Sequence, residues 1–162
     1  MKIFQNLLGK DNDIVIAAPV SGKLISIQEV DDPTFSDEIL GKGVAIIPSD
    51  GKIYAPADGT INTVVSTGHA IAMSSSDGAE ILIHVGIDTV RLNGKYFTTH
   101  TYVSQKVKKG DLLLEADIEK IRAEGYDIIT PVIIYNADSF SGFQAMAPAD
   151  VAPGDDILIL QK

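Results

Sequence analysis

The chain has 162 residues, which fits one domain and is long enough to bury a core without cross-links. It contains no cysteine, which excludes disulfides, thiolate metal sites and a cysteine nucleophile. With 22 acidic against 13 basic residues the formal charge is −9, a balance that repels nucleic acid and favours basic protein partners. No stretch approaches the ~20 apolar residues of a membrane span, and the first ten residues lack a signal-peptide pattern, so we expect a cytoplasmic protein.

The order of apolar segments predicts an all-β domain with little helix. Residues 1–12 are interpreted as a flexible or weakly amphipathic tail, in which Met1–Leu8 would make peripheral membrane contact at most. Residues 13–162 are predicted to form a single domain with one short helix around Asp117–Ala123. Strands are expected at Ile14–Ala17, Val44–Ile47, Gly59–Val65, Ile71–Met73, Ile81–Val85, Leu112–Glu115, Ile128–Ile134 and Ile157–Leu160. Short strands at this spacing, separated by turn residues, are typical of an antiparallel sandwich or barrel.

Two segments of the sequence recur. Residues 18–24 read APVSGKL and residues 55–61 read APADGTI. Residues 107–111 (VKKGD) and 151–155 (VAPGD) each precede an apolar strand. The two spacings differ, so this is not a solenoid of stacked repeats. We therefore expect two similar halves folded into one β body.

His84 is the first candidate for chemistry, at the end of the apolar segment 80–89 (EILIHVGIDT). A lone histidine in such a strand is most often a satisfied core residue. Here Gly86 lies two residues on, where its carbonyl could hold one ring nitrogen and leave the other as a nucleophile. Asp88 adds a charge at the same strand end.

His69 lies in a predicted turn, residues 66–70 (STGHA), from which paired strands would bring it close to His84. Thr67 could orient this second histidine or bind a phosphate through its hydroxyl. Two imidazoles suit either metal binding, which needs a third ligand, or phosphoryl transfer, which needs positioning and charge stabilisation. The residues alone leave both open.

Several ordered motifs, taken together, resemble one protein family. Residues 84–90 (HVGIDTV) resemble the histidine signature of glucose-type enzyme IIA components of the bacterial phosphoenolpyruvate-dependent sugar phosphotransferase system, and residues 67–70 (TGHA) resemble that family's second-histidine motif. Further similar motifs are Ala18-Pro19 with Gly22, Asp32-Pro33-x-Phe35, Gly41-x-Gly43, Ala55-Pro56-x-x-Gly59-x-Ile61 and Thr130-Pro131-Val132. The similarity covers about residues 14–161, and it implies an antiparallel β-sandwich built from a duplicated hybrid motif.

The resemblance implies that the chain is a phosphotransferase component, a transient phosphohistidine carrier without a cofactor. His84 would accept the phosphoryl group on Nε2 from the histidine-containing phosphocarrier protein. His69 would stabilise it, with Thr67 supporting His69. The group would then pass to a cysteine of the IIB domain of a membrane sugar permease. The resemblance does not identify the sugar.

The resemblance also implies a docking surface for partners, with regulatory targets among them. Asp32 and Asp88 would contact a basic residue of the phosphocarrier. Apolar residues would form a rim of surface around the histidines, namely Phe35, Val44, Ile46 and Val90.

The chain departs from the family's pattern at Val85, where the family usually has phenylalanine, and we therefore expect a smaller apolar rim. Arg91 adds a positive charge beside the motif. His100 is interpreted as a surface or loop histidine.

Other functions fit the sequence less well. A zinc hydrolase of similar fold would need a His-x-His pair, but Leu82 and Gly86 flank His84 at that spacing. A regulatory zinc at His69 and His84 would need a carboxylate from a partner. A biotin or lipoyl carrier needs a lysine at a hairpin tip, yet serines follow Met73. A β-sandwich interaction module without chemistry would leave the paired histidine motifs unexplained.

Overall fold

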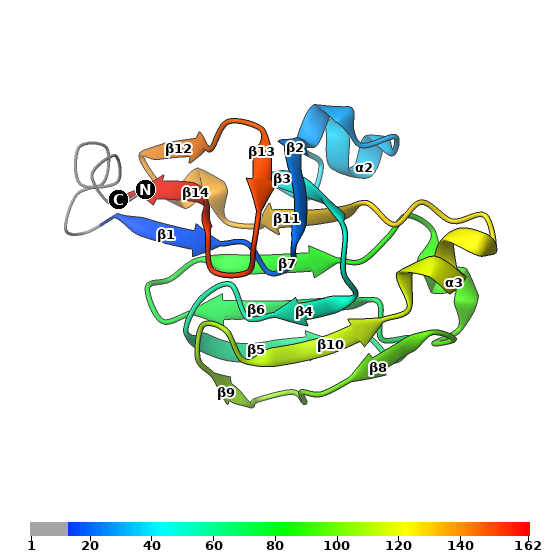
Figure 1. Ribbon diagram of the computed structural model, residues 1–162. Helices are drawn as coiled ribbons and strands as arrows, with labels where there is room; N and C mark the ends of the chain where they lie inside the picture. The colour runs from blue at the N-terminus through cyan, green and yellow to red at the C-terminus, as the bar shows by residue number, and fades with distance from the viewer. Residues whose placement is uncertain (1–12) are drawn as a thin grey trace.

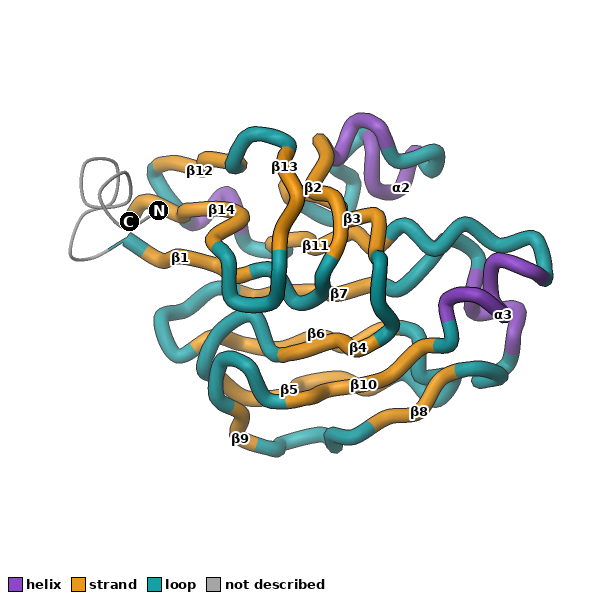
Figure 2. The backbone as a smooth tube through the Cα atoms, in the orientation of Figure 1, coloured by secondary structure: helices purple, strands orange, loops and turns teal. Residues whose placement is uncertain are grey.

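The structure is a computed structural model that describes residues 13–162, and almost all of its regular elements are strands (Figures 1 and 2). The strands are β1 (Ile14–Ala17), β2 (Gly22–Ser26), β3 (Lys42–Pro48), β4 (Lys52–Tyr54), β5 (Gly59–Val64), β6 (Ala70–Ser75), β7 (Glu80–His84), β8 (Phe97–Thr99), β9 (Lys106–Val107), β10 (Leu112–Ala116), β11 (Thr130–Ile134), β12 (Gly142–Ala145), β13 (Ala149–Val151) and β14 (Asp156–Gln161). The helices are α2 (Pro33–Ser36), α3 (Ile118–Ala123) and the 3₁₀ turns η1 (Ile27–Glu29), η2 (Thr89–Leu92) and η3 (Ala137–Ser139). The predicted tail at residues 1–12 lies outside the described residues.

The strands form three sheets with antiparallel pairing throughout the described residues. An eight-stranded sheet has the order β13-β2-β3-β11-β7-β6-β5-β9, and two three-stranded sheets have the orders β1-β14-β12 and β4-β10-β8. The main apolar core combines side chains from all three sheets. The predicted all-β antiparallel fold is therefore confirmed. No helix among residues 13–162 is long and apolar enough to cross a membrane.

The repeated segments lie against each other in the structure. Ala17 N–H, next to the first copy, donates to Pro56 O at 3.0 Å, and Tyr54 N–H, next to the second, donates to Pro19 O at 2.7 Å. Each copy thus binds the backbone of the other through an equivalent hydrogen bond.

The second pair of repeated segments, residues 107–111 and 151–155, makes equivalent contacts in the two halves. Ala18 N–H donates to Asp155 O at 2.7 Å, and Ala55 N–H donates to Asp111 O at 2.8 Å. In both copies the aspartate side chain also closes its own turn by accepting from the amide three residues earlier. The two recurrences are therefore one structural duplication.

The sheet order shows the same duplication. The eight-stranded sheet reads alike from both ends when β13, β2, β3 and β11 are matched with β9, β5, β6 and β7. The strands β4 to β10 run without interruption between β3 and β11, so one half of the repeat is inserted into the other. The halves meet where β7 pairs with β11, at the centre of the sheet. The site described below lies at the end of β7 (Figure 1).

A second apolar cluster covers the other face of the large sheet. It joins Phe35 of α2 to sheet residues such as Leu82, Ala45 and Ile133. The helix α2 begins at Asp32, whose carboxylate accepts from Thr34 N–H at 3.0 Å. This cap fixes the start of α2, and so helps to hold the Phe35 ring against the sheet.

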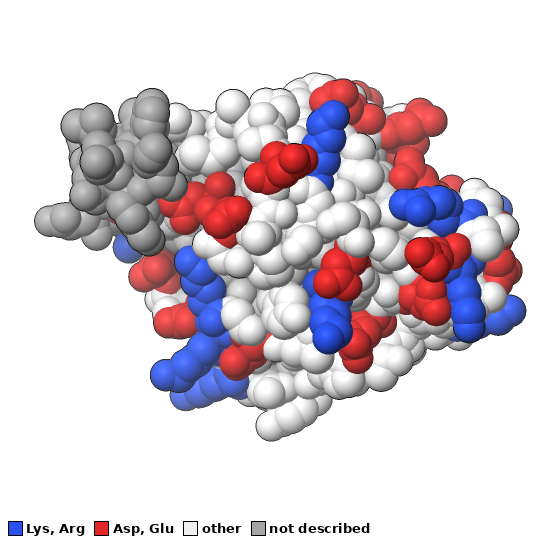
Figure 3. Space-filling model, viewed as in Figure 1, with Lys and Arg blue, Asp and Glu red and all other residues white. Residues whose placement is uncertain are grey.

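Acidic side chains are spread over the face of the molecule seen in Figure 3, and lysine and arginine side chains lie among them. The net charge of −9 therefore does not by itself mark a docking surface on this face. Only charged residues close to the histidines can direct a partner to them.

Candidate active site at the end of β7

His84 is the last residue of β7 and pairs with Ala70 at the start of β6. Its side chain is partly exposed, and its Nδ1 lies 2.8 Å from Gly86 O. A carbonyl oxygen can only accept, so Nδ1 carries the hydrogen. The neutral ring then has its lone pair on Nε2, the ring nitrogen on which a nucleophile at this position would depend.

Gly86 is needed for this contact because of its backbone conformation. Its φ is +82°, in the region that favours glycine. A Cβ at this position would overlap Thr89 Cγ2 and would lie 2.9 Å from Asp127 O. The predicted role of Gly86 in orienting His84 thus agrees with the geometry of its carbonyl.

His69 lies just before β6, and its backbone carbonyl accepts from Val85 N–H at 2.8 Å. This bond places His69 beside His84: the ring centroids are 4.9 Å apart and the planes make an angle of 80°. His69 Nδ1 lies 2.7 Å from Thr67 Oγ1, so Thr67 fixes the ring from the other side. The structure brings together all three residues that sequence reasoning selected here.

Two phenylalanine rings enclose the histidine pair. Phe35 lies against His84 with centroids 5.1 Å apart, and Phe97 of β8 lies 6.4 Å from His69. Sequence reasoning missed Phe97, because β8 was not among the predicted strands. Each imidazole thus has an aromatic ring against it.

Burial keeps both histidines neutral at pH 7. Burial, together with the neighbouring His84, lowers the pKa of His69 from 6.5 to about 4. Burial also lowers the pKa of His84, and the Gly86 carbonyl, Asp32 and Asp88 partly offset this effect. A neutral His84 retains the lone pair that a nucleophile needs.

The lowered pKa of His69 predicts that stability depends on pH. The unfolded imidazole titrates near 6.5 and the folded one near 4, so below 6.5 the unfolded chain binds a proton that the folded chain does not. The stabilising contribution is present above pH 6.5 and is lost as the pH falls to about 4. Relative to His69→Gln, the wild type should lose on the order of 2 kcal/mol across this window. Urea unfolding of both proteins at pH 7 and 4.5 measures this, and a constant difference would contradict it.

Asp32 and Asp88 lie close enough to His84 to raise its pKa, as the docking prediction requires. Asp32 is partly exposed and also caps α2. Asp88 is exposed, has a left-handed φ of 60°, and its side chain makes no cap bond to η2. The Asp32 carboxylate therefore caps a helix, whereas the Asp88 carboxylate does not.

The predicted apolar rim is wrong at Val44 and Ile46. These side chains are 1% and 0% exposed and belong to the main core. Side chains alternate along a strand, so a shift of one residue moves a prediction to the opposite face. On β3 it is Ala45 that belongs to the cluster with Phe35.

The remaining rim predictions have mixed outcomes. Val90 is 51% exposed and lies on η2, directly after Asp88 and Thr89. Phe35 contributes little surface, since only 4% of it is exposed. The expectation that Val85 makes the rim smaller is wrong, because this residue is 1% exposed and packs in the main core.

Comparison with known proteins identifies the family of the chain. Residues 14–140 match the family described as phosphoenolpyruvate-dependent sugar phosphotransferase system, EIIA 1. The chain belongs to this family. It is 37% identical over 161 residues to the PTS system glucose-specific EIIA component of Haemophilus influenzae, covering 99% of this chain and 97% of the relative.

Other relatives in the family are longer. The chain is 46% identical over 143 residues to the PTS system beta-glucoside-specific EIIBCA component of Dickeya chrysanthemi, covering 88% of this chain but 23% of the relative. It thus spans about a quarter of such relatives. The solved structure of glucose permease IIA from Mycoplasma capricolum is 31% identical, has a TM-score of 0.84, and covers 91% of this chain and 95% of that one. The EIIA fold is therefore confirmed.

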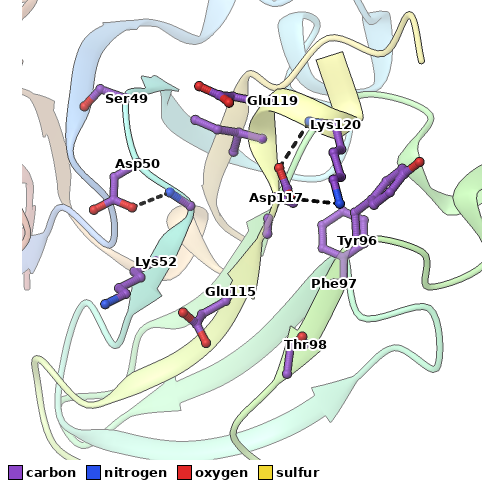
Figure 4. A pocket seen from close by; sticks show the side chains of 13 residues that line it. Ser49, Asp50, Lys52, Tyr96, Phe97, Thr98, Glu115, Asp117, Glu119 and Lys120 are labelled. Atoms are coloured by element: carbon purple, nitrogen blue, oxygen red, sulfur yellow. Dashed lines mark hydrogen bonds and ion pairs between the residues drawn. The ribbon is translucent and has the colours of Figure 1, made fainter. Parts of the chain in front are cut away.

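Two hollows lie outside the histidine pair of this EIIA-family chain. One of about 380 Å³ is lined by Asp31, Asp88, Asp127 and Arg91, which places the unusual arginine among carboxylates beside the site. The other, of about 670 Å³, lies between β4, β8, β10 and the start of α3 (Figure 4). The larger groove contains neither histidine.

Two carboxylates of the larger groove, those of Asp117 and Glu115, have partners within the chain. Asp117 accepts from Lys120 N–H at 3.2 Å and lies 3.9 Å from Lys120 Nζ, as Figure 4 shows. Glu115 lies 2.7 Å from Nε2 of His100, which is exposed, as expected. These contacts are structural, and we assign no chemistry to the groove.

Proposed function

We propose that this chain carries phosphoryl groups in the cytoplasm, accepting them on His84 Nε2 from the histidine-containing phosphocarrier protein and donating them to the IIB domain of a sugar permease. The observation that carries this proposal is the 2.8 Å contact between His84 Nδ1 and Gly86 O. It supports Nε2 as the atom with the lone pair, at the partly exposed end of β7. Family membership supports the reaction class.

The transfer step balances without water or a metal. The Nε2 lone pair of His84 attacks phosphorus, and the bond from phosphorus to the donor's histidine nitrogen breaks. The electron pair of that bond stays on the donor ring, whose other nitrogen carries a hydrogen, so the donor leaves as a neutral imidazole. The His84 ring keeps its hydrogen on Nδ1 and takes over the positive charge. Such a step depends on positioning and charge stabilisation, both of which a fixed imidazole pair can supply.

His69 would stabilise the bound phosphoryl group. If the Thr67 hydroxyl donates to Nδ1 across their 2.7 Å contact, the hydrogen of the neutral ring lies on Nε2. That N–H would then donate to a phosphoryl oxygen on His84, whose ring is 4.9 Å away between centroids. The negative charge of the phosphoryl group would also raise the lowered pKa of His69.

The partners are inferred from the relatives. Curated relatives named EIIBCA or EIICBA components join a segment like this chain to B and C parts, which supports a IIB domain as acceptor. Their names specify beta-glucoside and glucosamine, whereas other relatives are glucose-specific. IIB domains of all three specificities therefore belong in the test.

Reconstitution tests the proposal. The protein is mixed with phosphoenolpyruvate, enzyme I and the phosphocarrier, and mass spectrometry locates the phosphate. The expected product carries one phosphate on His84, and it is discharged when a matching IIB domain is added. Phosphate on His69 or His100, or a label that no IIB domain removes, would contradict the proposal.

Docking of the phosphocarrier should depend on salt through Asp32 and Asp88. Charges beside an interface mainly raise the rate of encounter, and screening shortens their reach to ~8 Å at physiological salt. We expect transfer to slow by about tenfold from low to high salt. In Asp32→Asn with Asp88→Asn it should be slower at low salt and nearly independent of salt.

The substitutions in this test preserve the local structure. Asparagine also caps helices, as Asp32 does for α2, and it tolerates the left-handed backbone of Asp88. Asp117→Asn with Asp150→Asn is the matched control, because it removes the same charge at two aspartates that are not among the groups shifting the pKa of His69 or His84. Stopped-flow rates across a salt series decide, and an unchanged salt slope in the first pair would leave these aspartates with structural roles alone.

We also propose a regulatory zinc site that a partner completes. For zinc, His69 would take the other tautomer, in which Nδ1–H donates to Thr67 Oγ1; with His84 Nδ1–H donating to Gly86 O, both Nε2 atoms then offer a lone pair to the metal. Within residues 13–162 no group of three or more His, Asp or Glu could hold an ion, so a partner carboxylate would have to supply the third ligand. Calorimetric zinc titration tests this, and binding that is equally tight without a partner would contradict it.

A further inference from the structure

The Gly86 carbonyl, which contacts His84, belongs to the short loop of residues 85–87. Each peptide group of this loop makes its own hydrogen bonds to neighbouring residues. In the peptide group between residues 85 and 86, Val85 O accepts from the Thr89 hydroxyl at 2.6 Å. The N–H of the same group, on Gly86, donates to Ile129 O at 3.0 Å. This peptide plane is therefore fixed from both sides.

The next peptide group carries the carbonyl that contacts His84. Its N–H, on Ile87, donates to Asp127 O at 2.9 Å. A trans peptide is planar, and its N–H and C=O point in opposite directions. With the N–H directed at Asp127, the Gly86 carbonyl points away from it and toward His84 Nδ1, at 2.8 Å.

The anchors of this loop differ in kind. Ile129 and Asp127 contribute backbone oxygens, and the Asp127 carboxylate closes their turn by accepting from Ile129 N–H at 2.9 Å. Thr89 contributes its side chain, which is 0% exposed. Its hydroxyl binds Val85 O, and its methyl group fills the space that a Cβ on Gly86 would occupy.

We propose that Thr89 is a positioning residue for the phosphoryl acceptor, because its hydroxyl fixes the Val85 and Gly86 backbone and so holds His84 in the form protonated on Nδ1. Free neutral imidazole exchanges between two tautomers, and the one protonated on Nε2 has its lone pair on Nδ1, which faces Gly86 O, and none on Nε2 to attack phosphorus. The inference rests on the proposed phosphorylation of His84. Sequence reasoning gave Thr89 no role.

Removing the hydroxyl should loosen this arrangement. In Thr89→Val the side chain keeps its shape, but Val85 O loses its donor inside the protein. A buried acceptor without a partner costs about 1–3 kcal/mol, so the loop would move to find another one. We expect phosphorylation to slow by about tenfold, the lower end of the ~10–100-fold loss seen when partners that orient metal-bound histidines are removed.

The test compares Thr89→Val and Thr89→Ser with a control of the same kind. Thr101 is also buried, and its hydroxyl donates to Gln105 Oε1 at 2.6 Å, in the loop between β8 and β9. Thr101→Val therefore removes a buried hydroxyl without touching the backbone around Gly86. Two readouts are measured at equal folded fraction: the rate of phosphorylation and the ¹⁵N NMR signals of the His84 ring.

The expected result is that Thr89→Val shows His84 signals from the form protonated on Nε2 together with the slower rate. Thr89→Ser, which keeps the hydroxyl, should restore both readouts. Thr89→Val with the wild-type tautomer and rate, or equal losses in Thr101→Val, would overturn the assignment. If the wild type accepted no phosphate while Thr89→Val still changed the tautomer, the proposed function would fail and the positioning role would stand.

Discussion

Replacement of His84 by alanine should abolish phosphorylation of the protein while leaving it folded. The variant lacks the only side chain whose Nδ1 contacts Gly86 O, and with it the proposed nucleophile. His84 is partly exposed at a strand end, so water can replace it at that carbonyl. We expect stability to change by only about 1–2 kcal/mol, including the lost contact with Phe35. Intact-mass spectrometry after incubation with the phosphorylated phosphocarrier measures the label.

The matched control for this prediction is His100→Ala. His100 is exposed and pairs with Glu115, and we assign it no part in transfer. Its variant should be labelled at the wild-type rate. Phosphate on the His84→Ala protein, or a large loss of label in His100→Ala, would show that His84 is not the phosphoryl acceptor.

The sequence was sufficient to predict the histidine pair and most strands of four or more residues, although β2 and β12 were missed. Segments such as Ile14–Ala17 and Ile81–Val85 combine β-branched residues with flanking turns, and strands form there with ends that differ by at most one residue. The helix expected at Asp117–Ala123 forms as α3, with Asp117 as its cap. These predictions succeeded because local pattern and tertiary structure agree.

The short strands could not be predicted, because their sequences carry little local preference. The strand β8 has the sequence FTT and β9 has two residues, and both depend on hydrogen bonds to distant partners. The helix α2, a single turn after Asp32, was also missed. Pairing with distant segments decides such elements, and one sequence does not reveal that pairing.

The face of a buried strand was equally hard to assign. In Lys42–Pro48 almost every residue is buried, so the alternation that separates two faces is lost. The family resemblance placed Val44 and Ile46 on the surface, and the local pattern could not correct this prediction, although both residues pack in the core. Thr89 escaped notice for a related reason, since its function depends on a hydroxyl bond to a residue four positions earlier.

The duplication places the site in one half of the molecule alone. His84 pairs with Ala70, whereas the matched position in the other half is Ile133, which pairs with Gly43. Ile133 is fully buried within the cluster that contains Phe35. The two halves thus supply one framework, and only the inserted half carries the imidazoles.

The last prediction separates the two histidines. His69→Gln keeps a hydrogen-bond donor beside His84 but cannot become a cation, whereas His69 gains a proton more readily once a phosphoryl dianion lies next to it. The variant should accept phosphate at nearly the wild-type rate, since a basic phosphocarrier brings its own positive charge. It should donate about 10²–10⁴-fold more slowly, the range in which positioned proton donors act.

The expected difference between accepting and donating phosphate in His69→Gln has an electrostatic cause. The proposed acceptor in a IIB domain is a cysteine that reacts as a thiolate, so the second half-reaction brings a further negative charge toward the phosphoryl group. Without a cation at position 69 this repulsion is not balanced. Rapid-quench measurement of both half-reactions decides, with His100→Gln as control, since it makes the same substitution at an exposed histidine to which no part in transfer is assigned. Equal rates for His69→Gln and the wild type in both directions would remove His69 from the mechanism.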